Sequence, residues 1–295
     1  MFLPAIRGFC RNFAQTKARL SPGTLYLMEW LAYPAAIIMG ILLGLLGGGG
    51  SVLTLPILVY LLHIPTGMAT TYSMFVVGVS ACAGAVNYII KKEVSWRAVL
   101  VFGIPSVLSI YFARKIVFPA LPSIIKILGW PVSKDTLLMM IFAAFMLLAS
   151  WSMIRKRKSG MPSEPGEAKV QDARYILLLL EGIAVGMIVG LIGAGGGFLI
   201  IPALVILMQL PMKKAVGTSL TLIFINSLLG FLSDLQNAVV IDWKMLLIFT
   251  GFAFAGIVGG TLLSRKIEGE RLRPLFGWFI LAMGLLIITE ELILK

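Results

Sequence analysis

The sequence predicts an all-α polytopic membrane protein built from two homologous repeats of about four transmembrane segments each. Of its 295 residues, 59% are hydrophobic and 13% are charged, whereas soluble domains carry roughly a quarter charged residues. The mean hydropathy is +0.99, and the apolar blocks exceed the ~18 residues that indicate a membrane span. A glycine-rich string that occurs twice indicates the repeat.

The repeated string lies in the first apolar segment of each half. GLLGGGGSVLTLP at residues 44–56 returns as GLIGAGGGFLIIP at residues 190–202, an offset of 146. The same order of landmarks then follows in both halves: Pro65 and Pro211, Ser73 and Ser219, Gly84 and Gly230, Trp96 and Trp243, and the RKI triads 114–116 and 265–267. This shared order predicts a duplication.

The apolar blocks between loop signals give the elements in chain order. In the first half they are 24–46 and 51–62 on either side of the glycines, 66–90, 97–118 and 135–154. In the second half they are 174–193 and 197–210, 215–236, 243–264 and 273–293. The predicted organisation is a basic leader (1–22), a first transmembrane repeat (23–154), a basic hydrophilic linker (155–172) and a second transmembrane repeat (173–295). The linker is rich in Pro, Gly, Ser and charge, and the leader lacks the apolar core of a cleaved signal peptide.

The net charge of +12 predicts contact with membrane lipid, not with nucleic acid. The 25 Lys and Arg residues lie mostly between apolar blocks, where basic residues orient helices and meet anionic headgroups. The two cysteines form no disulfide framework. With a single histidine the chain offers no multi-histidine metal site, and no cofactor is expected.

The relative orientation of the two repeats stays open between two alternatives. The segments after the glycines, 51–62 and 197–210, would each be about 18–21 Å long as helices, short of the ~30 Å hydrocarbon core. If each completes a broken helix, the repeats are parallel; if each is a separate leg, they are inverted. The basic loop residues fit both alternatives equally. Inversion is favoured weakly, by analogy with transporters that combine interrupted helices and inverted repeats.

The glycine clusters predict two helix breaks that could bind an anion. An opened helix leaves N–H and C=O groups that lipid cannot satisfy, and glycine allows positive φ and close backbone approach. A helix that restarts presents free N–H groups and the positive end of its dipole. The candidate substrate-binding residues are Gly47, Gly48, Gly49, Gly50, Ser51, Tyr72, Ser73, Gly193, Gly195, Gly196, Gly197, Thr218 and Ser219.

Hydroxyl groups follow each glycine string in both halves. Tyr72 and Ser73 align with Thr218 and Ser219, and their hydroxyls could add donors to an oxyanion site. Alternatively they bond to carbonyls of their own helix.

Acidic and amide residues inside the apolar segments are further candidates. Glu181 lies about seven residues into its segment and is a candidate for proton or ion coupling. Glu29 and Asp234 lie nearer to segment ends, where an interfacial position is expected. Asn87 and Asn226 are expected to make hydrogen bonds between helices.

Roles for the glycine clusters besides anion binding have weaker support. Glycines could serve only to let helices pack closely. A dinucleotide fingerprint would need a preceding strand, and a Walker loop would need a Gly-Lys-Ser/Thr ending. An intramembrane protease would have to use His63 as its sole histidine base, without an HExxH motif. The chain is therefore not expected to be an enzyme.

The doubled glycine cluster with its following proline resembles the TauE/SafE sulfite-exporter family. The run LPMKKAVGTS at residues 210–219 and the pair Asp242-Trp243 are similar to the second-half signature of that family. The resemblance covers about residues 34–293, although the first half has ATTYS at 69–73 where the family pattern is AxGTS. It implies transport of small sulfur-containing or organic anions such as sulfite and sulfoacetate, in a prokaryotic-type inner membrane.

Together these features predict a secondary transporter of a small oxyanion that works by alternating access around the paired breaks. The chain has no ATP-binding motif, so energy would come from the membrane potential or an ion gradient. A passive anion channel and a non-transporting membrane assembly subunit are the alternatives. The predicted partners are a small anionic substrate and membrane lipid; a homo-oligomer stays open.

Overall fold

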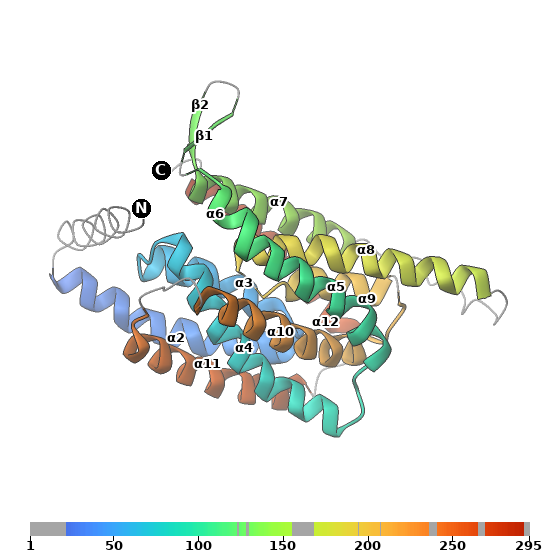
Figure 1. Cartoon of the computed structure of the whole chain (residues 1–295). Helices are drawn as coiled ribbons and strands as arrows, with labels where there is room; N and C mark the ends of the chain where they lie inside the picture. The colour runs from blue at the N-terminus through green and yellow to red at the C-terminus, as the bar shows by residue number, and fades with distance from the viewer. Residues whose placement is uncertain are drawn as a thin grey trace.

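The computed structural model describes residues 22–122, 124–127, 130–154, 168–193, 195–206, 208–235, 241–264 and 269–291. Residues 1–21 of the predicted leader and 155–167 of the predicted linker lie outside this part of the chain. Within the described part, the chain is built almost wholly of helices (Figure 1).

The first half contains α2 (Pro22–Leu46), α3 (Gly49–Pro56) with its π-helical extension η1 (Ile57–Leu61), α4 (Thr66–Ile90), α5 (Trp96–Phe112) with η2 (Ala113–Val117) and α6 (Phe118–Ala120), and α7 (Lys134–Ile154). The second half contains α8 (Ala168–Ile192), α9 (Gly197–Ile206), α10 (Met212–Leu235), α11 (Trp243–Ser264) and α12 (Gly269–Thr289). The predicted spans 66–90 and 243–264 coincide with α4 and α11.

Several boundaries differ from the sequence prediction, and one element was not predicted. Helix α8 begins at Ala168, inside the predicted linker, because its first residues favour helix although they are polar. Helix α9 ends at Ile206, before the predicted 210. A short antiparallel hairpin of β1 (Ile124–Ile127) and β2 (Trp130–Ser133) was not predicted; it projects beyond the helical body in Figure 1.

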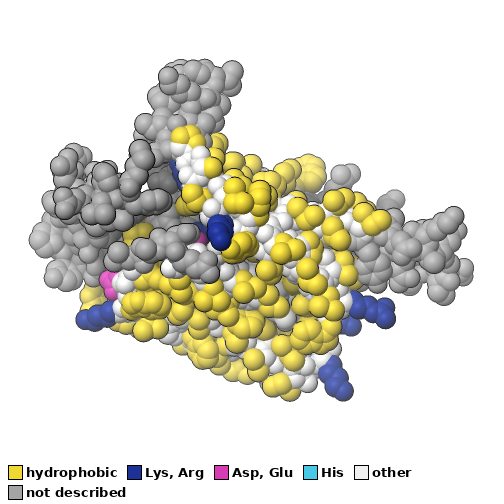
Figure 2. Space-filling view, in the orientation of Figure 1, with side chains coloured by type: hydrophobic (Ala, Val, Ile, Leu, Met, Phe, Trp, Pro, Cys, Tyr) yellow, Lys and Arg dark blue, Asp and Glu magenta, His cyan; other side chains and the backbone are white. Residues whose placement is uncertain are grey.

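Four helices of the described chain are long and apolar enough to cross a membrane. They are α4, α5 with its extensions to Ala120, α10 and α11. Shorter apolar helical stretches lie in α2, α3, α7, α8 and α12. The face drawn in Figure 2 is mostly hydrophobic, with Lys and Arg side chains mainly near its margins. The prediction of a polytopic helical membrane protein is confirmed.

At the first glycine cluster the chain turns back, so that α3 packs against α2. The hydroxyl of Thr54 lies 2.7 Å from the sulfur of Met39 on α2. A Cβ on Gly50 would overlap the carbonyl oxygen of Met39 and lie 2.5 Å from Cβ of Leu43. The leg after the glycines is therefore a separate element and does not continue the line of α2.

Helices of the two halves pack against each other in pairs. Helices α2 and α11 contact each other in the same order along both helices: Gly256 packs on Ile37, and Gly260 packs on Ile41. The same holds for α5 and α8, so both pairs run parallel: Gly182 packs on Phe102, Gly186 on Ser106 and Gly190 on Ile110. Helices α4 and α10 cross antiparallel, with Gly230 against Met74 and Gly84 against Leu220. In the α4–α10 crossing, each of the two contacts maps onto the other through the 146-residue offset.

The close α2–α11 packing makes a stability prediction. A Cβ on Gly256 would overlap the carbonyl oxygen of Ile37, whereas one on Gly259 of the same helix meets nothing within 4 Å. Gly256→Ala is expected to lower the free energy of unfolding by about 1–3 kcal/mol through overpacking. Gly259→Ala is the matched control and should leave thermal unfolding in detergent unchanged. Equal destabilisation by both variants would contradict this packing.

Candidate functional site

The two glycine breaks meet backbone to backbone. We call residues 47–50 the first break, and Gly193 together with residues 195–197 the second break. A Cβ on Gly48 would overlap the carbonyl group of Gly197, and one on Gly197 would lie 2.5 Å from Cα of Gly48. Residues far apart in the sequence are thus brought together at a point where neither can carry a side chain.

The turns of both breaks depend on glycine. Gly47 has φ +66° and its counterpart Gly193 has φ +76°; Gly195 and Gly196 have φ +65° and +72°. Side chains disfavour this left-handed region. The legs that follow also end alike, since His63 and Gln209, 146 residues apart, have φ +51° and +53°. The local conformation of the breaks therefore follows directly from the sequence.

The first break is held by two serine hydroxyls. Ser51 Oγ donates to the carbonyl oxygen of Gly48 at 2.7 Å. Ser219 Oγ, from α10, donates to the carbonyl oxygen of Gly47 at 2.8 Å. Both predicted serines lie at the break and are fully buried. Their hydroxyl protons are engaged with backbone carbonyls, so each hydroxyl stabilises the turn itself.

The second break lies against α4, η2 and α10. A Cβ on Gly193 would lie 2.5 Å from Cβ of Thr70 and 2.8 Å from Nη2 of Arg114. A Cβ on Gly195 would lie 2.7 Å from a methyl group of Val77 and 3.3 Å from Oγ of Ser227. A charged guanidinium group and a hydroxyl group therefore stand directly beside this backbone.

Several buried polar atoms on α4 and α10 have no hydrogen-bond partner among the described residues. They are Oγ of Ser73, Ser80 and Ser227, and Oδ1 of Asn226. Each residue is fully buried. Nδ2 of Asn226 donates to Oγ of Ser106 on α5 at 2.8 Å, which confirms the predicted bond between helices. Because buried polar atoms are normally hydrogen-bonded, the hydroxyl of Ser227, which lies beside Gly195, is suited to a polar ligand.

Three predicted residues lie away from the breaks. The Tyr72 hydroxyl accepts from the backbone N–H of Asp242 at 2.7 Å, just before α11. Thr218 Oγ1 accepts from the N–H of Ser95 at 2.9 Å and donates to the carbonyl of Lys214 at 2.7 Å. Glu181 is half-buried on α8, about 18 Å before the second break along the helix. The first two connect helix ends.

A buried ion pair beside the second break was missed from the sequence. Arg114 Nη1 donates to Oδ2 of Asp234 at 2.8 Å, and the side chains are 2% and 7% exposed. Thr71 Oγ1 donates to the same carboxylate oxygen at 2.6 Å. Asp234 lies near the end of α10, as expected from the sequence, but its carboxylate is buried between α10, α4 and η2.

The landmark alignment concealed Arg114. It matched the triad 114–116 with 265–267, as if both were loop signals. The packing instead pairs Gly44 with Ile257 and Thr261, and its counterpart Gly190 with Ile110 and Ala113. In that alignment of the two halves, the counterpart of Arg114 is Thr261. The signal available was that Arg114 and Asp234 each lie within an apolar segment, where a charged residue is a candidate functional residue by default.

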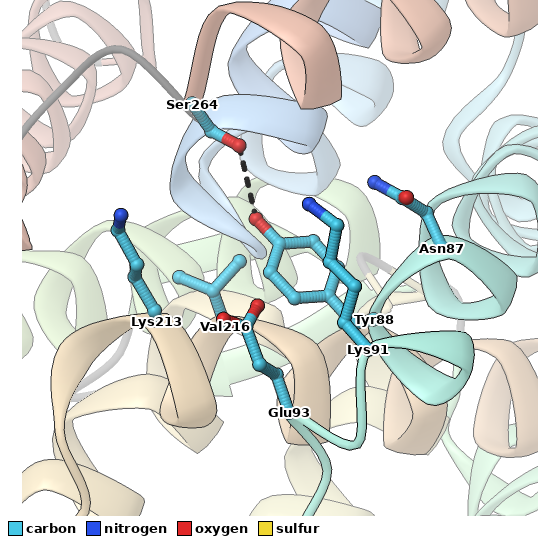
Figure 3. Close-up of a pocket in the computed structure, with 7 residues that line it drawn as sticks. All are labelled: Asn87, Tyr88, Lys91, Glu93, Lys213, Val216 and Ser264. Atoms are coloured by element: carbon cyan, nitrogen blue, oxygen red, sulfur yellow. Dashed lines mark hydrogen bonds between the residues drawn. The ribbon is translucent and has the colours of Figure 1, made fainter.

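A pocket of about 230 Å³ opens at the other end of the bundle (Figure 3). It is lined by Asn87, Tyr88, Lys91, Glu93, Lys213, Val216 and Ser264. The hydroxyls of Tyr88 and Ser264 lie 3.1 Å apart. Val216 also lies 2.8 Å from a Cβ built on Gly47. The pocket therefore ends against the first break, with two lysines at its rim.

Two links across the halves start from equivalent residues on α4 and α10. Tyr88 on α4 is 146 residues before Asp234 on α10. Tyr88 reaches Ser264 at the end of α11, and Asp234 reaches Arg114 at the end of α5. On α4, Thr71 and Tyr88 are 17 residues apart, or about 25 Å. The glycine breaks thus lie between a hydroxyl link at one end and an ion pair at the other.

Comparison with known proteins identifies relatives along nearly the whole chain. The sequence profile described as "Sulfite exporter TauE/SafE" matches residues 6–128 and 32–287. The chain is 28% identical over 262 residues to a probable membrane transporter protein of Xylella fastidiosa (strain 9a5c), covering 86% of this chain and 92% of that protein. It is 23% identical over 279 residues to the probable membrane transporter protein YunE of Bacillus subtilis (strain 168), covering 88% and 98%. No solved structure matches the chain significantly.

Proposed function

Because the chain belongs to the sulfite exporter TauE/SafE family, a family of membrane transporters, we propose that it is a secondary transporter of a small oxyanion. Sulfite or an organosulfonate is the proposed substrate, and export across a prokaryotic-type inner membrane is the proposed direction. The observation that carries the proposal is the backbone contact of the two breaks, Gly48 against Gly197.

The chemistry around this contact supports a small anion. Restarting helices α3 and α9 direct free N–H groups toward the breaks, and helix N-termini favour negative charge. The unpartnered hydroxyls of Ser73 and Ser227 add neutral donors. Arg114, whose charge is paired with Asp234, places guanidinium N–H groups beside Gly193. An oxyanion could use all three kinds of donor.

An inverted repeat is part of the proposal. Its support is the antiparallel crossing of α4 and α10, whose contacts repeat under the 146-residue offset. If both helices cross the membrane, matching helices of the two halves run in opposite directions. Transporters with such inverted repeats bind substrate at the interface between the repeats. They expose that site to the two sides of the membrane in turn by rocking one repeat or bundle against the other.

The Tyr88–Ser264 hydrogen bond and the Arg114–Asp234 ion pair, each of which joins the two halves, fit alternating access. Opening the bundle at one end would separate Tyr88 from Ser264, and opening it at the other would separate Arg114 from Asp234. Glu181 is the proposed coupling residue, since it is a half-buried carboxyl within an apolar helix.

Flux in proteoliposomes tests this function. Purified protein would be reconstituted with unlabelled sulfite inside and ³⁵S-sulfite outside. A transporter should accumulate label transiently above equilibrium by counterflow, and methanesulfonate should compete. A passive anion channel would equilibrate label without counterflow, and an assembly subunit would neither carry nor bind sulfite. Either result would overturn the proposal.

A ligand-dependent stability measurement provides a second check. A ligand that binds only the folded state raises apparent stability with its concentration. Sulfite, sulfoacetate and methanesulfonate are expected to raise the unfolding temperature in detergent, and equimolar chloride is not. If all four shift it equally, the effect is ionic strength and not a site.

A further inference from the structure

We propose that Arg114 binds the transported oxyanion through the side-on fork formed by its Nε–H and Nη2–H groups. Family membership alone assigns no role to this residue. The proposal rests on the proposed function and adds to it the group that recognises the substrate. Its basis is the way in which the neighbouring residues hold the guanidinium group.

The ion pair with Asp234 uses only one corner of the guanidinium group. Nη1 donates to Oδ2 of Asp234 at 2.8 Å and to Oγ1 of Thr70 at 3.3 Å. The carboxylate is in turn anchored by Thr71 at 2.6 Å. Asp234 therefore holds Arg114 in place end-on and neutralises its charge, without occupying the fork.

The fork itself lacks an oxygen acceptor among the described residues. Nε is buried and has no hydrogen-bond partner there. Nη2 donates to the sulfur of Met74 at 3.3 Å, and a thioether is a weak acceptor. Nε–H and Nη2–H lie on the same side of the planar group, which is the geometry that binds two oxygens of one anion.

The fork lies at the second break. Nη2 lies 2.8 Å from where a Cβ on Gly193 would be. Because Gly193 has no side chain, its backbone packs directly against Thr70 and the guanidinium group. An anion bound at this break would therefore lie next to the fork. The ring of Phe118 lies 5.5 Å from Cζ of Arg114 and limits its movement by cation–π contact. The substrate class that fits is an anion with two or more oxygens on one atom, such as sulfite or a sulfonate.

Selective replacement of the fork tests the assignment. Arg114→Lys keeps a charge for Asp234 but removes the fork, so the KM for sulfite in proteoliposomes should rise about tenfold or more. Discrimination between methanesulfonate and thiocyanate as competitors should fall too, because thiocyanate offers no pair of oxygens. Lys115→Gln removes the neighbouring charge, which is exposed and contacts Tyr111, and should leave KM within about twofold.

A second variant keeps the test decisive if Arg114→Lys does not fold. Arg114→Gln combined with Asp234→Asn removes both charges together and should abolish sulfite binding while retaining a cooperative unfolding transition. Wild-type KM and selectivity in either folded Arg114 variant, or an equal change in Lys115→Gln, would overturn the inference while leaving the proposed function standing. If wild-type protein itself neither binds nor carries sulfite, both proposals are wrong.

Discussion

Replacing Asp234 with alanine is expected to lower the free energy of unfolding by about 3–5 kcal/mol, because Arg114 would stay buried without its counter-charge. The pair is 2.8 Å apart and nearly inaccessible. Removing one partner of such a pair is far more harmful than removing both. The measurement is chemical unfolding in detergent, followed by tryptophan fluorescence.

Two comparisons show whether the ion pair is the cause. Asp242→Ala also removes an aspartate, but one that is exposed and accepts from the N–H of Met245 at the start of α11; it should cost only the ~0.5–2 kcal/mol of a helix cap. Arg114→Met with Asp234→Leu should regain most of the lost stability, yet carry no oxyanion. If Asp234→Ala is no worse than Asp242→Ala, the buried pair does not stabilise the fold.

Adding a methyl group where the breaks touch is expected to reduce oxyanion flux about 100-fold, since displacing a binding group by 1 Å costs roughly that much. A Cβ on Gly48 would overlap the Gly197 carbonyl group. Gly48→Ala and Gly197→Ala should therefore each force the breaks apart. Initial rates of ³⁵S-sulfite counterflow, normalised to reconstituted protein, measure the loss.

Gly67→Ala is the matched control for these variants. A Cβ on Gly67, at the start of α4, meets nothing within 4 Å. Its flux should equal that of the wild type. Full flux in both break variants would show that the contact between the breaks does not contribute to transport.

Much of the helical layout could be predicted from hydropathy because membrane helices are long, apolar and separated by polar links. The prediction matched α4 and α11 residue for residue and placed both breaks, since glycine clusters are rare inside such segments. The reversal of α3 on α2 could not be predicted, because the length of the leg alone fits two arrangements. The contact between Gly48 and Gly197 also depends on packing between halves, which sequence spacing does not encode.

The sequence placed the glycines and two serines of the candidate site at the breaks. The glycines, Ser51 and Ser219 lie together as expected. Tyr72 and Thr218 could not be separated from them, since a hydroxyl near a helix start suits a ligand or a helix contact equally. Arg114 and Asp234 are 120 residues apart, each near the end of an apolar segment, and only the crossing of α5 and α10 makes them partners.

Direct localisation of a bound anion is the sharpest measurement. Selenite has the charge and pyramidal shape of sulfite, and its selenium atom gives an anomalous X-ray signal. In crystals soaked with selenite, we predict one anomalous peak beside the second break, within hydrogen-bond distance of its backbone N–H groups and of Arg114. A peak elsewhere, or none at concentrations that inhibit sulfite flux, would contradict the assignment of the paired breaks as an oxyanion site.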